Sequence, residues 1–117
     1  MSGDCVLIVE DEPHILLLAE AILGQAGYDT VPAQTLVQAV VIIQSRRTVD
    51  LVFTDIQLED HADGGITVGE LVNRERPGTP VLYTSGHAAT CTPFLPKPYT
   101  DLALTKAVAD LLTRSPT

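Results

Sequence analysis

Carboxylates, a hydroxyl and a lysine stand at the ends of short apolar runs in this sequence. Glu10 and Asp11 follow the run CVLIV, and Asp55 ends the run LVFTD. Ser85 ends VLYTS, and Lys97 follows FLP. Carboxylates brought together repel one another and favour a cation, and oxygen ligands with room for water and phosphate suit Mg²⁺. A hydroxyl and a lysine suit phosphate oxygens, and a carboxylate can itself be the nucleophile. These residues therefore predict a carboxylate that is phosphorylated with the help of a metal ion.

The apolar runs alternate with helical patterns, and this alternation must position those residues. The pattern predicts strands at residues 5–10, 28–33, 50–55, 80–85 and 94–96, and helices at 13–26, 35–47, 66–76 and 101–113. Strands that alternate with helices indicate a parallel α/β sheet with helices on both faces. Ligands of such sheets bind beyond the carboxyl ends of the strands, where the polar residues stand.

One connection is too short for this pattern. Only the eight residues 86–93 separate the last two predicted strands. A crossover between parallel neighbours usually needs about a dozen residues or more and usually contains a helix. This link contains Gly86, Pro93 and small polar residues, so we expect an irregular and mobile loop there.

Length and composition limit the possible functions. The chain has 117 residues, of which 45% are hydrophobic and 19% charged, and its net charge is -8. We expect a single domain over residues 1–117. Direct binding to nucleic acid is not expected, because it needs basic patches. The sequence has no secretory signal and no apolar run long enough to span a membrane. The two cysteines, Cys5 and Cys91, do not have the spacing of metal ligands. We therefore expect them to be reduced thiols in a cytoplasmic protein.

The set Glu10-Asp11, Asp55, Ser85 and Lys97-Pro98 resembles the receiver domain of two-component response regulators. The resemblance covers essentially the whole chain. It implies a flavodoxin-like, doubly wound, five-stranded parallel sheet in the order 2-1-3-4-5. It also implies a signalling module that accepts a phosphoryl group from a histidine kinase and relays it by altered protein–protein interaction. No turnover enzyme is expected.

The resemblance also implies roles for single residues. Asp55 is the expected phosphoacceptor, Asp11 an Mg²⁺ ligand, and Glu10 a support for the metal. The backbone carbonyl of Gln57 is expected to supply a further ligand. Lys97 is expected to match the phosphoryl charge.

Four residues are candidates for tuning and switching. Ser85 lies five residues after Pro80, where the family has its switch hydroxyl, and Phe94 stands where the family has its switch aromatic. Packing in the core is the other interpretation of Phe94. Gln57 and His87 each lie two positions past a site residue, so we expect them to tune the lifetime of the phosphoryl group; His87 alone also fits a solvated loop residue.

The chain departs from the family in the link. Receivers usually have a helix between the switch hydroxyl and the last strand, so this chain resembles a receiver whose fourth helix is reduced to a loop. A subgroup with Phe-Ala-Thr-Gly in place of residues 83–86 is similar, although His87 does not continue that motif. The face that receivers with this helix use to dimerise would then be incomplete.

Other functions fit parts of the pattern. A constitutive adaptor with a decayed site is one, and an aspartyl-phosphate phosphatase is another. The phosphatase would need an acid/base at the position of Gln57, which cannot serve. A flavodoxin-like electron carrier is a third, because the segment TSGHAAT is similar to a phosphate-binding loop. Flavodoxins have that loop after the first strand, whereas this segment follows the fourth.

The predicted first helix is apolar on more than one face. Two interpretations stand: a helix that lies unusually deep in the core, or a docking surface for the histidine kinase, as the resemblance implies. The sequence names neither the kinase nor the downstream protein.

Overall fold

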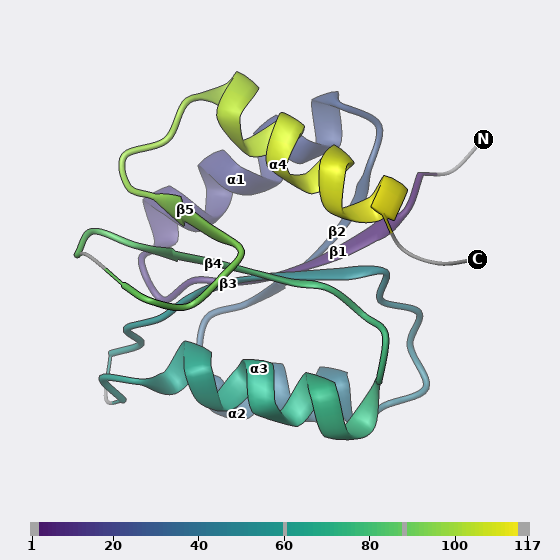
Figure 1. The fold of residues 1–117 in the computed structure, drawn as a ribbon, viewed down its shortest axis with the longest axis vertical. Helices are drawn as coiled ribbons and strands as arrows, with labels where there is room; N and C mark the ends of the chain where they lie inside the picture. Colours follow the sequence, from purple (N-terminus) through teal and green to yellow (C-terminus); the bar gives the residue numbers. More distant parts are fainter. Residues whose placement is uncertain (1–2, 60, 88, 115–117) are drawn as a thin grey trace.

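Five parallel strands form one sheet in a computed structural model that describes residues 3–59, 61–87 and 89–114 (Figure 1). The strands are β1 (Cys5–Val9), β2 (Asp29–Ala33), β3 (Leu51–Asp55), β4 (Val81–Ser85) and β5 (Phe94–Pro96). Their order in the sheet is β2-β1-β3-β4-β5. The order confirms the predicted flavodoxin-like, doubly wound sheet, and β2, which contains Pro32, lies at an edge as proline requires.

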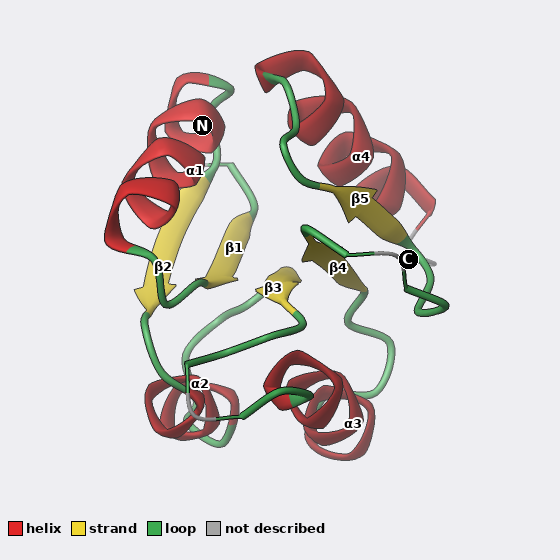
Figure 2. Ribbon diagram, turned by 90° about the vertical axis from the view of Figure 1, so that its left-hand side faces the viewer, coloured by secondary structure: helices red, strands yellow, loops and turns green. Residues whose placement is uncertain are grey.

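The helices cover both faces of the sheet (Figure 2). On one face lie α1 (Pro13–Gln25) and α4 (Asp101–Arg114); on the other lie α2 (Leu36–Ile43) and α3 (Gly64–Glu75). Each face buries its own cluster of apolar side chains, because every second residue of a strand points to the same face. None of the described helices is long and apolar enough to cross a lipid bilayer.

Helix α2 ends earlier than the sequence pattern predicts, and the reason is tertiary. Thr35 caps its start by accepting a hydrogen bond from the Gln38 N–H at 3.1 Å. At its end, the Arg76 guanidinium donates to the carbonyl oxygens of Ile43 at 2.8 Å and Ser45 at 2.9 Å. These bonds satisfy carbonyls that a helix end leaves free, so the helix stops at Ile43 and not at residue 47.

Helix α3 begins two residues before the predicted start, with Gly64 and Gly65. The Gly65 N–H donates to the Ile56 carbonyl at 2.8 Å. A Cβ atom on Gly65 would lie 2.1 Å from the Asp55 carbonyl oxygen, so the close approach of α3 to the end of β3 requires glycine.

The link between β4 and β5 contains no helix among its described residues, 86, 87 and 89–93. The prediction of a loop is therefore confirmed for that part; residue 88 lies outside the described residues. The two strands nevertheless pair directly, because the Tyr83 N–H donates to the Pro93 carbonyl at 3.0 Å and the Lys97 N–H to the Ser85 carbonyl at 2.9 Å.

Candidate functional site

Lys97 joins two buried carboxylates at the carboxyl edge of the sheet. Its Nζ atom lies 2.8 Å from Glu10 Oε1 and 2.9 Å from Asp55 Oδ2. Glu10 directly follows β1, Asp55 ends β3 and Lys97 directly follows β5, so three strand ends supply the group. Glu10 is 3% exposed and Asp55 6%, so their charges are largely removed from water. Buried carboxylates need a cationic partner, and Lys97 provides one for both.

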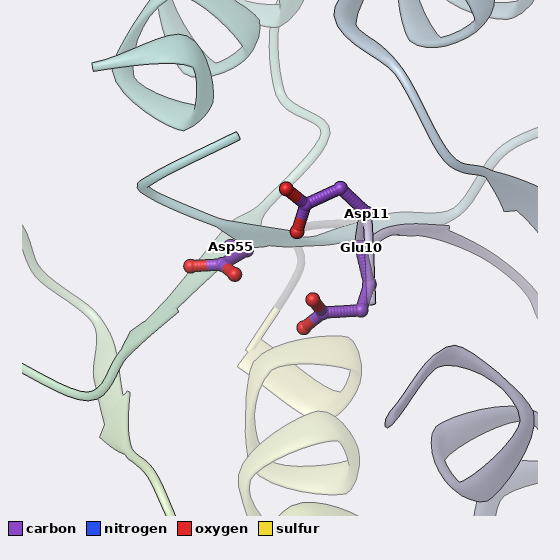
Figure 3. Close-up of side chains that lie close together, drawn as sticks. All are labelled: Glu10, Asp11 and Asp55. Atoms are coloured by element: carbon purple, nitrogen blue, oxygen red, sulfur yellow. The ribbon is translucent and has the colours of Figure 1, made fainter. Parts of the chain in front are cut away.

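Asp11 completes a cluster of three carboxylates (Figure 3). Oxygen atoms of Glu10, Asp11 and Asp55 all lie within 4.8 Å of one another. Figure 3 shows that the three side chains lie close together. An all-oxygen donor set with a half-exposed member is chemistry that suits Mg²⁺, which keeps several waters, so the residues present fit this ion.

Burial and pairing shift the acid–base properties of the cluster. Burial raises the pKa of Glu10 to about 7, although hydrogen bonds from Lys97 and the Glu12 N–H act in the opposite direction. Burial alone would lower the pKa of Lys97, but its hydrogen bonds to Glu10 and Asp55 outweigh this effect and raise the pKa. Lys97 therefore stays charged at neutral pH.

Ser85 lies beside this cluster and is held by Gln57. Its hydroxyl donates to Gln57 Oε1 at 2.9 Å and accepts from the His87 N–H at 3.0 Å. The Gln57 N–H in turn donates to Asp55 Oδ1 at 3.2 Å. The side chain and backbone of Gln57 thus connect Ser85 to Asp55, a connection that the sequence pattern does not reveal.

Phe94 and His87 lie at the margin of the group. Phe94 begins β5 and is half-buried, with Tyr83 as its neighbour in the sheet. The His87 side chain is exposed, and its link to the site is the backbone hydrogen bond to Ser85. The structure thus brings Glu10, Asp11, Asp55 and Lys97 together directly, and Ser85 through Gln57.

Two buried hydroxyls lie near the cluster but were not predicted as site residues. Thr84 lies directly opposite Asp55 in the sheet, and Tyr99 follows Lys97 by two residues. Neither hydroxyl has a hydrogen-bond partner among the described residues. Strand periodicity would have placed Thr84 on the same face as Leu82, but no sequence signal points to the Tyr99 hydroxyl.

Helix α1 exposes apolar side chains next to the site. Leu16, Ala19, Ile22 and Leu23 are buried, whereas Leu17 is 64% and Leu18 51% exposed. The interpretation of a helix unusually deep in the core is therefore wrong. A pocket of about 370 Å³ runs from Ile15 and Leu18 to Lys97 and Pro98, so this apolar surface reaches the carboxylate cluster.

Comparisons with known proteins agree with this geometry. A family model described as the response regulator receiver domain matches residues 6–109. The nitrogen assimilation regulatory protein NtrX of Azorhizobium caulinodans is 38% identical over 82 residues, which are 70% of this chain and 18% of that protein. The transcriptional regulatory protein GlrR of Escherichia coli is 32% identical over 120 residues, 94% of this chain and 26% of that protein. The chain thus spans about a fifth to a quarter of the length of these relatives.

Solved structures share the fold over nearly the whole chain. A response regulator receiver protein from Sinorhizobium medicae superposes with a TM-score of 0.89 at 30% identity, covering 97% of this chain and 98% of that one. The receiver domain of the hybrid histidine kinase CckA gives 0.76 at 29% identity, covering 92% and 98%.

Proposed function

This chain belongs to the response regulator receiver family of two-component signalling, and from that premise we propose that Asp55 accepts a phosphoryl group from a histidine kinase. Receiver domains are signalling modules and not turnover enzymes. One observation carries the proposal: Asp55 is a buried strand-end carboxylate bound by Lys97 and within 4.8 Å of two further carboxylates. Such a group can act as a nucleophile toward a phosphoryl group.

In the proposed reaction, a carboxylate oxygen of Asp55 attacks the phosphorus of the phosphodonor. The new P–O bond forms as the bond to the donor nitrogen breaks, and the donor keeps that electron pair. The Gln57 N–H on Oδ1 and Lys97 on Oδ2 fix the carboxylate beforehand. Lys97 then matches a phosphoryl oxygen, because its ammonium group is a point charge with three donors.

Glu10, Asp11, Asp55 and the backbone carbonyl of Gln57 would hold Mg²⁺ in this mechanism. When bound, the ion supplies positive charge that offsets the charge of the carboxylates and of the phosphoryl oxygens. The fit of the three carboxylates supports this assignment.

Ser85 and Phe94 are the proposed switch residues. The Ser85 hydroxyl, which now donates to Gln57, would turn to a phosphoryl oxygen and draw the start of the link with it. Phe94 would change its packing at the other end of the link. Gln57 and His87 are both hydrogen-bonded to the Ser85 hydroxyl, and we propose that they tune the lifetime of the phosphoryl group.

The proposed phosphodonor docks on α1, beside the site. The exposed Leu17 and Leu18 and the pocket that reaches Lys97 support this location. The output is an altered interaction with a downstream protein in the cytoplasm, without direct contact to nucleic acid or membrane. The acidic charge of -8 supports this choice, because like charges repel a nucleic acid.

Labelling of the intact protein tests the proposal. Acetyl phosphate with Mg²⁺ should add one phosphoryl group, detected by mass, and Asp55→Asn should abolish the addition. Glu59→Gln is the matched control, because Glu59 is an exposed carboxylate in the connection that follows Asp55. Labelling that persists in Asp55→Asn would contradict the assignment, and no labelling of the wild type would favour a constitutive adaptor.

A further inference from the structure

The Tyr99 hydroxyl is buried beside the phosphorylation site without a hydrogen-bond partner among the described residues. A buried polar group in this state destabilises a fold by about 1–3 kcal/mol. Phenylalanine would fill the same space without this penalty. The hydroxyl is therefore an unsatisfied hydrogen-bond donor, and its surroundings indicate which acceptor it could bind.

Tyr99 lies over the strands that carry the carboxylates. Its ring packs edge-on against Phe53, with ring centroids 5.7 Å apart and planes at 68°. Phe53 and Asp55 are alternate residues of β3, so they share a face of the sheet. Ile8 is the neighbour of Phe53 in β1, and Glu10 follows Ile8 by two residues on the same face.

The charges around Tyr99 agree with this placement. Burial raises the pKa of Tyr99 to about 12, and the negative charge of Glu10 contributes next to it. Tyr99 therefore keeps its proton at neutral pH and can only gain by donating it in a hydrogen bond. Glu10 is a buried carboxylate whose charge acts on Tyr99, so it is an acceptor to which such a donation would be favourable.

Glu10 has two donors in the present structure, and phosphorylation removes one. Its Oε1 accepts from Lys97 at 2.8 Å and its Oε2 from the Glu12 N–H at 3.1 Å. If Asp55 is phosphorylated as proposed above, Lys97 is drawn to the phosphoryl oxygens and away from Glu10. The Oε1 atom of a carboxylate that is 3% exposed then loses its donor, which is costly.

We propose that the Tyr99 hydroxyl replaces Lys97 as a donor to Glu10 when Asp55 carries its phosphoryl group. Tyr99 is then a positioning residue that holds the carboxylate while Lys97 serves the phosphate. A carboxylate has about four acceptor positions, so this bond is compatible with a cation on the other oxygen. The proposal rests on the proposed function, because it needs Lys97 to move.

Tyr99→Phe tests the exchange, with beryllofluoride as the probe for the phosphoryl group. Phenylalanine keeps the ring on Phe53 and removes only the hydroxyl. With Mg²⁺ present, calorimetric titration should show beryllofluoride binding about tenfold more weakly to the variant, which corresponds to about 1.4 kcal/mol. Tyr28→Phe is the matched control, because Tyr28 packs against the same core cluster but lies at the opposite end of β2 from the site, and it should bind like the wild type.

A state-dependent readout separates this role from a merely structural one. Without beryllofluoride, Tyr99→Phe should be at least as stable toward urea as the wild type, because no bond is lost. The chain has three tyrosines, so the variant also assigns the Tyr99 ¹³Cζ signal, which should shift on addition of beryllofluoride.

The outcomes distinguish the two proposals. Equal beryllofluoride affinity of wild type and Tyr99→Phe, with normal acetyl phosphate labelling of both, would overturn the role of Tyr99 alone. A wild type that neither binds beryllofluoride nor takes a phosphoryl group would overturn the proposed function and this inference with it.

Discussion

The two connections on either side of β4 each join a pair of parallel neighbouring strands, but one contains a helix and the described part of the other does not. Residues 56–80 lead from β3 to β4 through the twelve-residue helix α3, which buries six of its residues. Residues 86–93 lead from β4 to β5 without a helix in their described part. Both β3 and β5 nevertheless pair in parallel with β4, and Asp55 and Lys97 meet at 2.9 Å.

The difference shows which parts of the fold position the site. The main chain at the strand ends does so directly: the Ile56 N–H donates to the Thr84 carbonyl at 2.9 Å, and the Lys97 N–H to the Ser85 carbonyl at 2.9 Å. A helix in the crossover covers the face of the sheet but is not needed for the register of the strand that follows. Changes to the α3 connection should therefore be costly, and changes to the link should not.

Among the substitutions proposed here, Gly65→Ala, in the α3 connection, should lower the free energy of unfolding most. The new Cβ would lie 2.1 Å from the Asp55 carbonyl oxygen and 2.7 Å from Ile56 Cα, and backbone atoms cannot yield as a flexible side chain can. We expect a loss of about 3 kcal/mol or more in the free energy of unfolding, measured with urea.

Gly24→Ala is the control for Gly65→Ala, because Gly24 lies in α1 and its added Cβ has no atom of the described residues within 4 Å. Alanine is the better helix former there, so this variant should be stabilised by about 0.5–1 kcal/mol. Equal stability of the two variants would contradict the close approach of α3 to β3.

The carboxylate cluster, and not the link, should carry the pH dependence of stability. The pKa of Glu10 is raised to about 7 in the folded protein from an ordinary value of 4.5. Between these values the folded state binds more protons than the unfolded state, so the free energy of unfolding falls as pH rises. Stabilisation by Glu10 is complete below pH 4.5 and lost as pH rises through 7, by at most about 3 kcal/mol.

Urea unfolding in EDTA between pH 4.5 and 8 measures this slope. Glu10→Gln should remove the contribution of Glu10, whereas Thr90→Ala, which changes an exposed residue of the link that does not titrate, should leave the slope as it is. A slope unchanged in Glu10→Gln would show that the carboxylate is not desolvated in the way its burial implies.

Gly69→Ala should have an intermediate effect, because it places a Cβ 1.9 Å from the Tyr83 hydroxyl and 2.9 Å from its Cζ. Tyr83 is half-buried on β4 with its hydroxyl against Gly69 of α3, so its ring can move where a backbone cannot. We expect destabilisation by about 1–3 kcal/mol.

Tyr83→Phe in the Gly69→Ala background should restore part of the lost stability, since it removes the atom in closest contact. A double-mutant cycle from urea unfolding measures this coupling. A coupling of zero would mean that Tyr83 does not rest on α3.

The sequence predicted most of the site because the site depends on strand ends. Five apolar runs and their alternation with helices determine which residues reach the carboxyl edge, and Asp55, Lys97 and Glu10 follow from that rule. The resemblance to receiver domains, which have their switch hydroxyl five residues after such a proline, singled out Ser85, whose hydroxyl is joined to Asp55 through Gln57.

What the sequence missed depends on side chains that meet from distant positions. Arg76 ends α2 from 33 residues away, and no local signal at residues 43–47 reports it. The early start of α3 was missed because glycine is a poor helix former, and only the approach of α3 to β3 explains it. The direction of the Tyr99 hydroxyl also depends on packing, against Phe53.

Gly86→Ala should have the smallest effect, and it tests the comparison most directly. Gly86 is the first residue of the link, and Gly65 is the second residue of α3. Unlike a Cβ on Gly65, an added Cβ on Gly86 has no atom of the described chain within 4 Å. The φ angle of Gly86 is not in the left-handed region, so alanine can adopt it without strain. Alanine also restricts the unfolded chain slightly more than glycine does, which favours the variant. We therefore expect a change within about 0.5 kcal/mol in urea unfolding, and unchanged acetyl phosphate labelling of Asp55. A loss as large as that of Gly65→Ala would mean that the link is packed as tightly as the α3 connection, and that the register of β5 depends on the link after all.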